Sequence, residues 1–370
     1  MNGTRNPSSG THPPAHRHVC GIVPPWLLER IAELDSPKLA RAASAARYSL
    51  LATRPYRFPE PGAEPRTATG SVETALATAV ASAPQRTIAD AGRTETLPGL
   101  LVRSEGEPPT ADDAVTNAYD GLGDTHALFA DAFSRNSIDD RGLPLLATVH
   151  YGDDYDNAFW NGERMVFGDG DGEVFRSFTS SLSVIGHELA HGVTQYTANL
   201  VYEGQPGALN EHVSDVFGAL VEQHARGQDA ASASWLIGEG LFTDEVEGNA
   251  LRSMLAPGTA YDDDVLGKDP QPAHFDDYIE TTDDNGGVHL NSGIPNRAFA
   301  SLAVALGGNA WERAGVIWYD TLTGPLSERA DFATCAAATL TAAIARFGVD
   351  STETSAVGEA WSLVGIVPAS

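Results

Sequence analysis

The sequence predicts an α+β protein in which a β-rich lobe is followed by an α-helical lobe, with a cleft between them. Three observations support this fold class. Short strand-like runs alternate with helical patches in residues 85–178, helical periodicity dominates residues 179–370, and a proline- and glycine-rich stretch separates both from a small N-terminal segment. The chain has 370 residues, which is enough for about two or three domains.

The region before the β-rich lobe is expected to have three parts. Residues 1–18 are rich in Pro, Ser, Gly and His and should form a disordered tail, because they offer little apolar surface to offset the entropy of ordering. Residues 19–53 predict a helical hairpin, in which Pro24 and Pro25 suit the first turn of the first helix. Residues 54–84 contain repeated prolines and glycines and predict a linker.

Strands and helices of the two lobes follow from periodicity. In the first lobe, Leu145–Tyr151 and Phe159–Phe167 are strand-like runs, and a capping signal at Thr110 and Asp113 predicts the start of a helix. In the second lobe, Phe332–Phe347 predicts a helix. A further helix carries its apolar residues on one face: Leu209, Val213, Val216, Phe217, Leu220 and Val221.

Composition excludes several classes of partner. The chain has 23 Lys and Arg against 50 Asp and Glu, a net charge of -27, so we expect no nucleic acid partner and no anionic membrane surface. No run approaches the roughly 18 apolar residues of a membrane-spanning helix. Residues 1–18 lack the apolar core of a secretory signal peptide. Cys20 and Cys335 lie too far apart in sequence to suggest a disulfide framework, and Cys335 is expected in the core.

The segment His187-Glu188-Leu189-Ala190-His191 carries the strongest chemical signal. On a helix, residues i and i+4 project side by side, so the imidazoles of His187 and His191 can bind one metal ion. Apolar neighbours such as Val184 and Val193 suit a buried helix. Taken alone, the pattern is equally compatible with a helix that carries solvent-facing histidines.

Two carboxylates on a second helix supply the context. Glu211 and Asp215 follow His191 at i and i+4 spacing, off the apolar face of that helix. One carboxylate can complete a set of two His and one acid that leaves a fourth zinc position for water, as a catalytic site requires. The other can accept the spare N–H of a ligand histidine. The alternative is a solvated acidic face, which is common in so acidic a chain.

At these residues the sequence resembles the thermolysin family of neutral zinc metalloproteases, over about residues 85–367. The resemblance implies a two-lobe fold with the zinc cleft between the lobes, and hydrolysis of peptide bonds by a zinc-activated water. Besides the helix just described, the motifs that carry it are Asn157-Ala158-Phe159-Trp160-Asn161, Met165-Val166-Phe167-Gly168-Asp169-Gly170-Asp171-Gly172, Ala250-Leu251-Arg252-Ser253-Met254 and Asp284-Asn285-Gly286-Gly287-Val288-His289-Leu290-Asn291-Ser292-Gly293-Ile294.

The resemblance also implies roles for individual residues. His187, His191 and Glu211 would hold one catalytic zinc ion, which leaves Asp215 to accept the spare N–H of a ligand histidine. Glu188 would be the general base that takes a proton from water and passes it to the leaving amine. The remaining implied positions are His289 and Tyr202 for oxyanion stabilisation, Asp284 for orienting His289, and Asn157, Ala158, Trp160 and Arg252 for binding substrate.

Two further comparisons with the family pattern concern substrate specificity and calcium binding. The positions of the family's primed-side pocket are apolar, so we expect cleavage on the amino side of Leu, Phe or similar residues. Those positions are Phe175, Phe178, Val184, Ile237 and Leu251. The family's double calcium site keeps Glu222 and Glu239 but has Ser183, Ser234, Leu236 and Gly240 where acidic ligands are expected. We therefore expect one calcium ion at most.

Residues Gly21–Leu28 resemble the short N-terminal propeptide of the protealysin branch of the family, which packs on the catalytic domain and blocks its cleft. The resemblance implies a zymogen whose own propeptide is its inhibitor, matured by a cut within about residues 52–84. Cys20 directly precedes the motif, and its thiolate would be a good ligand for the open position on zinc. The alternative is an unpaired thiol beside the tail.

Two other functions stay open at this point. One is a zinc-binding protein without catalysis, against which Glu188 argues because a structural zinc site needs no general base. The other is an exopeptidase on the same fold, although the Asn157–Trp160 strand and the Asp284–His289 loop fit an endopeptidase better. We expect a monomer that acts on peptides and proteins. It would be secreted by a route without a classical signal peptide or, alternatively, stay cytoplasmic.

Overall fold

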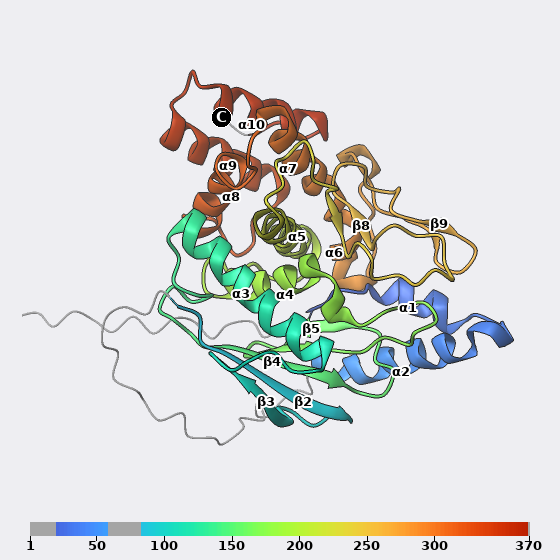
Figure 1. The fold of residues 1–370 in the computed structure, drawn as a ribbon. Helices are drawn as coiled ribbons and strands as arrows, with labels where there is room; N and C mark the ends of the chain where they lie inside the picture. Colours follow the sequence, from blue (N-terminus) through green and yellow to red (C-terminus); the bar gives the residue numbers. More distant parts are fainter. Residues whose placement is uncertain (1–19, 58–82, 369–370) are drawn as a thin grey trace, which may run out of the picture.

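The structure, a computed structural model, describes residues 20–57 and 83–368. Figure 1 shows a lobe built on a β-sheet and a second lobe built from helices, as the sequence predicts. The expected tail, residues 1–18, lies outside the described residues, as does most of the expected linker, residues 54–84. In the part of the chain that the structure describes, no helix has both the length and the apolar character needed to cross a membrane.

Most strand residues precede residue 170 and most helical residues follow residue 180. The strands are β1 (Cys20–Gly21), β2 (Arg86–Thr94), β3 (Leu100–Ser104), β4 (Leu145–Tyr151), β5 (Ala158–Trp160), β6 (Met165–Phe167), β7 (Leu236–Ile237), β8 (Arg252–Ser253), β9 (Asp262–Asp263) and β10 (Gly267–Lys268). The helices are α1 (Pro25–Ala32), α2 (Ala40–Arg57), α3 (Asp113–Phe133), α4 (Leu182–Gln195), α5 (Gly204–Arg226), α6 (Asp284–Asn291), α7 (Gly293–Leu306), α8 (Ala314–Thr323), α9 (Phe332–Phe347) and α10 (Thr352–Leu363).

The main sheet has six strands in the order β1-β5-β6-β4-β2-β3. Its centre is parallel, because β4 runs parallel to both β2 and β6. Its β1 edge is antiparallel: β5 pairs with β6 on one side and with the short N-terminal strand β1 on the other. A strand from before the linker therefore covers β5, which would otherwise form the edge of the sheet.

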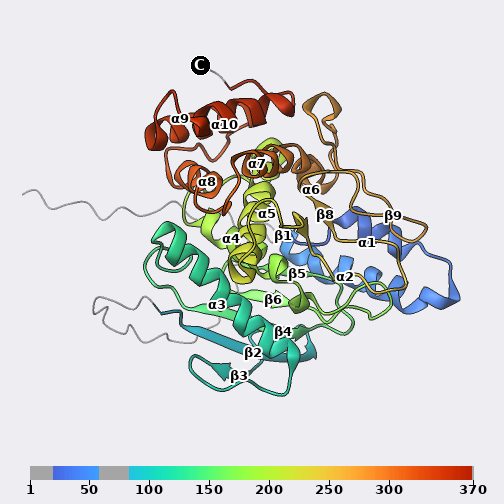
Figure 2. The ribbon, with the colours of Figure 1, turned by 45° about the horizontal axis from the view of Figure 1, so that its top comes forward.

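The expected helical hairpin is present as α1 and α2, which lie beside β5 in both views of the ribbon (Figures 1 and 2). The apolar residues Leu27, Leu28 and Ile31 of α1 are buried. Helix α2 continues to Arg57, whereas the sequence predicts a linker from residue 54. A proline in the last turn removes one backbone hydrogen bond without stopping this helix, so the predicted boundary is four residues early.

Two other predicted boundaries differ from the structure. The run Phe159–Phe167 is a hairpin of β5 and β6 because Asn161 starts a turn, accepting the N–H of Arg164 on its side-chain oxygen at 2.9 Å. Helix α3 begins at Asp113 with Asp112 as its N-cap, because the Asp112 carboxylate accepts the N–H of Ala114 at 2.9 Å.

Helices α4 and α5 pack against each other at the centre of the molecule (Figure 2). Two glycines at their contact permit the close approach. A Cβ added to Gly186 of α4 would lie 3.1 Å from the Cα of Gly218, and one added to Gly218 would lie 2.5 Å from the carbonyl oxygen of Ser183. A larger residue at either position would push apart the helices that carry the histidine and carboxylate ligands predicted from the sequence.

Residues that the sequence predicts to be in the core are buried in the structure. All six apolar residues predicted for one face of α5 are buried, and Cys335 of α9 is 3% exposed, as expected. The structure also decides between the two interpretations of the carboxylates on helix α5. Glu211 and Asp215 are both fully buried, so the solvated acidic face considered as an alternative is wrong. An unpaired carboxylate is costly to bury, so each of these two must have a compensating partner.

Candidate active site

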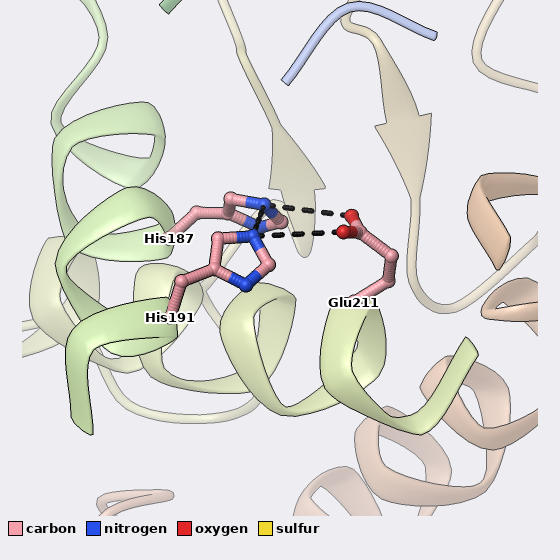
Figure 3. Close-up of side chains that lie close together, drawn as sticks. All are labelled: His187, His191 and Glu211. Atoms are coloured by element: carbon pink, nitrogen blue, oxygen red, sulfur yellow. Dashed lines mark hydrogen bonds and ion pairs between the residues drawn. The ribbon is translucent and has the colours of Figure 1, made fainter. Parts of the chain in front are cut away.

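Three side chains from two helices converge at the centre of the molecule. His187 and His191 lie one turn apart on α4, and Glu211 reaches toward them from α5 (Figure 3). The two Nε2 atoms are 3.0 Å apart, and each lies 3.5 Å from a carboxylate oxygen of Glu211. Donor atoms that bind one zinc ion at about 2.0–2.2 Å in a tetrahedron lie roughly 3.3–3.6 Å from one another. The two 3.5 Å distances lie in this range and the 3.0 Å distance is slightly shorter, so the three side chains are placed to bind a single zinc ion.

The protons on the two imidazoles argue for a cation as well. His187 Nδ1 lies 2.8 Å from Oδ1 of Asp215, and His191 Nδ1 lies 2.8 Å from Oδ1 of Asn210. Both oxygens are acceptors, so each Nδ1 carries the proton and each Nε2 keeps a lone pair. Two lone pairs and a carboxylate then face one another in a buried site, an arrangement that a divalent cation resolves.

Asp215, which accepts from His187, is itself held in place by Arg252 and Asn296. Arg252 donates from Nε to Oδ2 at 2.9 Å and from Nη2 to Oδ1 at 2.8 Å. Asn296 donates from Nδ2 to Oδ2 at 2.8 Å. Although burial acts in the opposite direction, the charge of Arg252 and the hydrogen bond from His187 keep the pKa of Asp215 well below its usual range. Asp215 therefore remains a carboxylate that accepts the N–H of His187.

Glu188 lies between the two histidines in sequence and is fully buried. Its Oε2 accepts the backbone N–H of Trp160 at 2.8 Å, whereas Oε1 has no hydrogen-bond partner among the described residues. Burial, and after it the charge of Glu211, raises the pKa of Glu188 well above its usual value. A carboxylate with one oxygen committed and a raised pKa is suited to take up a proton.

Tyr202, His289 and Asp284 form a second group beside Glu211. The Tyr202 hydroxyl donates to Oε1 of Glu211 at 2.5 Å and lies 3.4 Å from Nε2 of His289. On its other side, His289 Nδ1 lies 2.6 Å from Oδ1 of Asp284. Burial opposes a charge on His289, but the carboxylates of Asp284 and Glu211 raise its pKa above the usual value. The group supplies hydrogen-bond donors next to the three convergent side chains.

Strand β5 and Arg252 are occupied by the N-terminal segment. Ile22 donates its N–H to the carbonyl of Ala158 at 3.1 Å and accepts from Nη1 of Arg252 at 3.1 Å. Val23 donates to Oδ1 of Asn157 at 3.0 Å and accepts from its Nδ2 at 3.2 Å. The N-terminal segment thus lies extended on the residues that the sequence predicts for substrate binding.

The backbone of Cys20 pairs with Trp160 at the start of this segment, and its side chain lies outside the described part of the structure.

The apolar positions of the expected pocket are all buried, and they share one core cluster with Ile22. They are Phe175, Phe178, Val184, Ile237 and Leu251. Ile22 itself is fully buried.

Sequence reasoning missed several residues of the site. Asn210 and Ser214 both contact Nδ1 of His191, with Ser214 Oγ at 3.1 Å. Asn210 could have been found, because it directly precedes Glu211, a ligand predicted from the sequence, and lies one helix turn from Ser214. Asn296 gives no such signal, because it is 81 residues from Asp215 in sequence.

Comparison with known proteins agrees with this geometry. The catalytic domain of thermolysin metallopeptidases matches residues 80–195, and their α-helical domain matches residues 198–366. An extracellular metalloprotease of Pectobacterium carotovorum subsp. carotovorum is 47% identical over 351 residues, which cover 95% of this chain and 97% of the relative. Protease PrtS of a Photorhabdus strain is 52% identical over 283 residues, 76% of each chain.

A solved structure extends the likeness to the N-terminal segment. The precursor of protealysin, a metalloproteinase from Serratia proteamaculans, superposes with a TM-score of 0.84 at 50% identity. The match covers 94% of this chain and 100% of the precursor. The chain therefore belongs to the thermolysin family of metallopeptidases, in which it is a zinc metalloendopeptidase made as a zymogen.

Proposed function

We propose that His187, His191 and Glu211 hold the one catalytic zinc ion and that Glu188 is the general base of peptide-bond hydrolysis. The observation that carries the proposal is the convergence of two imidazole lone pairs and a carboxylate beside a second, buried carboxylate. When bound there, zinc supplies Lewis-acid polarisation of the scissile carbonyl and lowers the pKa of water toward about 7.

The protein residues then divide the work of proton transfer. Glu188 takes the proton of the attacking water, since the N–H of Trp160 holds only its Oε2 and burial raises its pKa. With that proton it is neutral, a form that burial favours, and it can pass the proton to the leaving amine. Asp215 keeps the proton of His187 on Nδ1 and so keeps Nε2 available as a ligand.

Tyr202 and His289 are the proposed donors to the developing oxyanion. His289 is suited to this role because Asp284 holds its Nδ1, which directs Nε2 toward the Tyr202 hydroxyl and Glu211. The raised pKa of His289 favours the protonated ring, in which Nε2 is a donor. Donors aimed at a charge that develops only in the transition state lower the barrier selectively.

Substrate is proposed to bind as an extended strand along β5, on the contacts that the N-terminal segment makes with Asn157, Ala158 and Arg252. Trp160 belongs to the same strand and continues its pairing. Recognition through backbone hydrogen bonds explains a broad tolerance of side chains, while one pocket selects the residue after the scissile bond.

The pocket is proposed to select apolar side chains, because the five residues expected to line it are Phe, Val, Ile or Leu and are buried. Incubating the mature enzyme with a peptide library should give cleavage on the amino side of Leu, Phe or similar residues. Burying a charged side chain there would cost several kcal/mol. A preference for Asp, Glu, Lys or Arg after the scissile bond would show that the pocket is assigned to the wrong residues.

The N-terminal segment is proposed to inhibit the enzyme by lying where substrate would bind. We assign residues 19–57 as propeptide, which extends the predicted range 19–53 by the last turn of α2. Residues 58–84 are then the processing region, and residues 85–178 and 179–370 are the two catalytic lobes. Support comes from the strand pairing of β1 with β5.

Ligation of zinc by Cys20 is a separate proposal. Unchanged zinc content and unchanged latency in the Cys20→Ser precursor would rule it out.

Calcium binding is proposed to be limited to one ion at most. Glu222 forms an ion pair with Arg226, and Glu239 accepts the hydroxyl of Ser234 at 2.8 Å. Serine, leucine and glycine at the other expected ligand positions supply no carboxylate to neutralise a second doubly charged ion. Calorimetric titration that detects two tightly bound calcium ions would contradict this proposal.

The enzyme is proposed to act outside the cell as a monomer on peptides and proteins. Support for the location comes from two relatives whose names describe them as extracellular metalloproteases. Activity in culture medium rather than in the cell fraction would agree with it. Export without a classical signal peptide stays a prediction, which the N-terminal sequence of the secreted zymogen checks. Light scattering of the purified protein checks the monomer.

Removal of the metal tests the whole proposal. The purified, matured enzyme should contain about one zinc ion per chain by elemental analysis and should digest casein. Phenanthroline should abolish the digestion, and added zinc should restore it. In the proposed mechanism water becomes a nucleophile only when zinc is bound to the three ligands. Casein cleavage that persists after complete removal of zinc would refute the proposal, and release of single terminal residues alone would indicate an exopeptidase.

A further inference from the structure

A chain of buried hydrogen bonds connects the core of the helical lobe to Asp215. The indole Nε1 of Trp318 on α8 lies 2.7 Å from Nε2 of His212 on α5. The Nδ1 of His212 lies 2.8 Å from Oδ1 of Asn296 on α7, and Nδ2 of Asn296 lies 2.8 Å from Oδ2 of Asp215. His212, Asn296 and Asp215 are fully buried, and Trp318 is 2% exposed.

Chemistry fixes the direction of every bond in this chain. An indole N–H can only donate, so Nε2 of His212 must accept and the proton of this ring lies on Nδ1. Nδ1–H therefore donates to Asn296, whose side-chain oxygen accepts. The amide group of Asn296 must then turn its NH₂ toward Asp215, which is the orientation that the distances show. Reversing any one bond would leave a buried donor facing a donor or an acceptor facing an acceptor.

The chain completes the set of donors around Asp215. Oδ1 accepts from His187 and Arg252, and Oδ2 accepts from Arg252 and Asn296. Without Asn296, Oδ2 would lose one of two donors, and the carboxylate could rotate away from His187. His212 also immediately follows Glu211 on α5, so the same chain ties the helix that carries the carboxylate ligand to α7 and α8.

We propose that Trp318, His212 and Asn296 are positioning residues that set the zinc affinity of the site by holding Asp215, and through it His187, in the ligating orientation. The proposal rests on the assignment of His187, His191 and Glu211 as zinc ligands. In the hydrogen bonds of the described residues, Trp318, His212 and Asn296 bind one another and Asp215. Partners of metal ligands typically change metal affinity about 10- to 100-fold when they are lost. Trp318, which is three hydrogen bonds from Asp215, should act near the lower limit.

Trp361 offers a matched control for Trp318. The two indole rings are stacked with centroids 6.1 Å apart, and Trp361 is fully buried. Its Nε1 donates at 2.8 Å to the Thr339 hydroxyl, which has no link to Asp215 in the described hydrogen bonds. Replacement of either tryptophan by phenylalanine removes one buried N–H donor and part of a ring from the same core, so the losses of stability should be similar.

The test measures zinc affinity of the full-length precursor by competition with a chromophoric chelator, together with thermal unfolding of the zinc-free protein. Trp318→Phe should raise the zinc dissociation constant roughly tenfold, whereas Trp361→Phe should change it less than about twofold, at similar unfolding temperatures. Asn296→Leu, which removes the donor to Asp215 directly, should weaken binding more than Trp318→Phe does. The Asn296→Leu variant also provides the test if the Trp318→Phe protein fails to fold.

Two outcomes separate the inference from the proposal on which it rests. If the wild-type precursor binds no zinc, the assignment of the metal ligands fails first. If the wild type binds zinc but Trp318→Phe and Trp361→Phe weaken binding equally, or Asn296→Leu leaves the dissociation constant unchanged, the chain is merely structural and the inference is overturned. The visible spectrum of the cobalt-substituted protein gives an independent measure, because it should change in Trp318→Phe and not in Trp361→Phe.

Discussion

Replacing Glu188 by glutamine is expected to lower the turnover of casein by the mature enzyme about 10²- to 10⁴-fold, with zinc still bound at one ion per chain. Glutamine has the shape of glutamate, and its side-chain oxygen can still accept the N–H of Trp160 that Glu188 accepts at 2.8 Å. It cannot take up a proton from water at neutral pH. The loss therefore falls on the chemical step, which initial rates on casein and on a short fluorogenic peptide measure.

Zinc content and thermal unfolding are the controls for this variant. Glu188 is fully buried, and its charge is disfavoured by burial and by Glu211, so a neutral amide should not lower the unfolding temperature. Wild type and variant are matured with the same added protease. A Glu188→Gln enzyme that keeps more than a tenth of wild-type turnover would show that another group is the base.

The convergence of the three proposed metal ligands could be predicted from sequence because most of their geometry is local. His187 and His191 are four residues apart on one helix, and Glu211 and Asp215 repeat this spacing on the next. Periodicity thus placed each pair on one helix face, and the resemblance to thermolysin-like enzymes brought the two faces together. The distances of 3.0 to 3.5 Å among the ligand atoms agree with this expectation.

The partners of these residues could not be predicted from spacing, because they come from distant elements. The sequence predicts Asp215 as an acceptor for a ligand histidine, but it does not reveal that Arg252 and Asn296, 37 and 81 residues away, neutralise and hold its carboxylate. The close packing of α4 on α5 likewise depends on Gly186 and Gly218 facing each other. A glycine in a helical pattern does not reveal from sequence alone what it faces.

Predicted boundaries of helices and strands differ from the structure where a single polar side chain determines the boundary. Asn161 turns one predicted strand into a hairpin, and Asp112 rather than Thr110 caps α3. Each outcome depends on which of several nearby Asn, Asp or Thr side chains reaches the backbone, and sequence patterns do not resolve a choice among neighbours. None of these errors moved a residue of the zinc site.

The second large effect is expected in the propeptide, where Ile22→Ala should make the uncut precursor active. Ile22 is fully buried between the two hydrogen bonds that its backbone makes to Ala158 and Arg252. Loss of a buried isoleucine side chain costs about 2–5 kcal/mol, which shifts the equilibrium between the docked and released N-terminal segment by roughly 30-fold or more. The segment would then be held on β5 by its backbone hydrogen bonds and by the remaining buried side chains, such as Val23, and would exclude substrate less completely.

The measurement compares the intact precursor with its own matured form on a short fluorogenic peptide, and mass spectrometry verifies that the precursor is uncut. Leu51→Ala is the matched control, because Leu51 lies on α2 of the same segment with its side chain 66% exposed, and its truncation should leave latency unchanged. If Ile22→Ala and Leu51→Ala precursors are equally latent, docking at β5 does not inhibit the enzyme. The block would then have to come from the packing of α1 and α2 on the catalytic lobes.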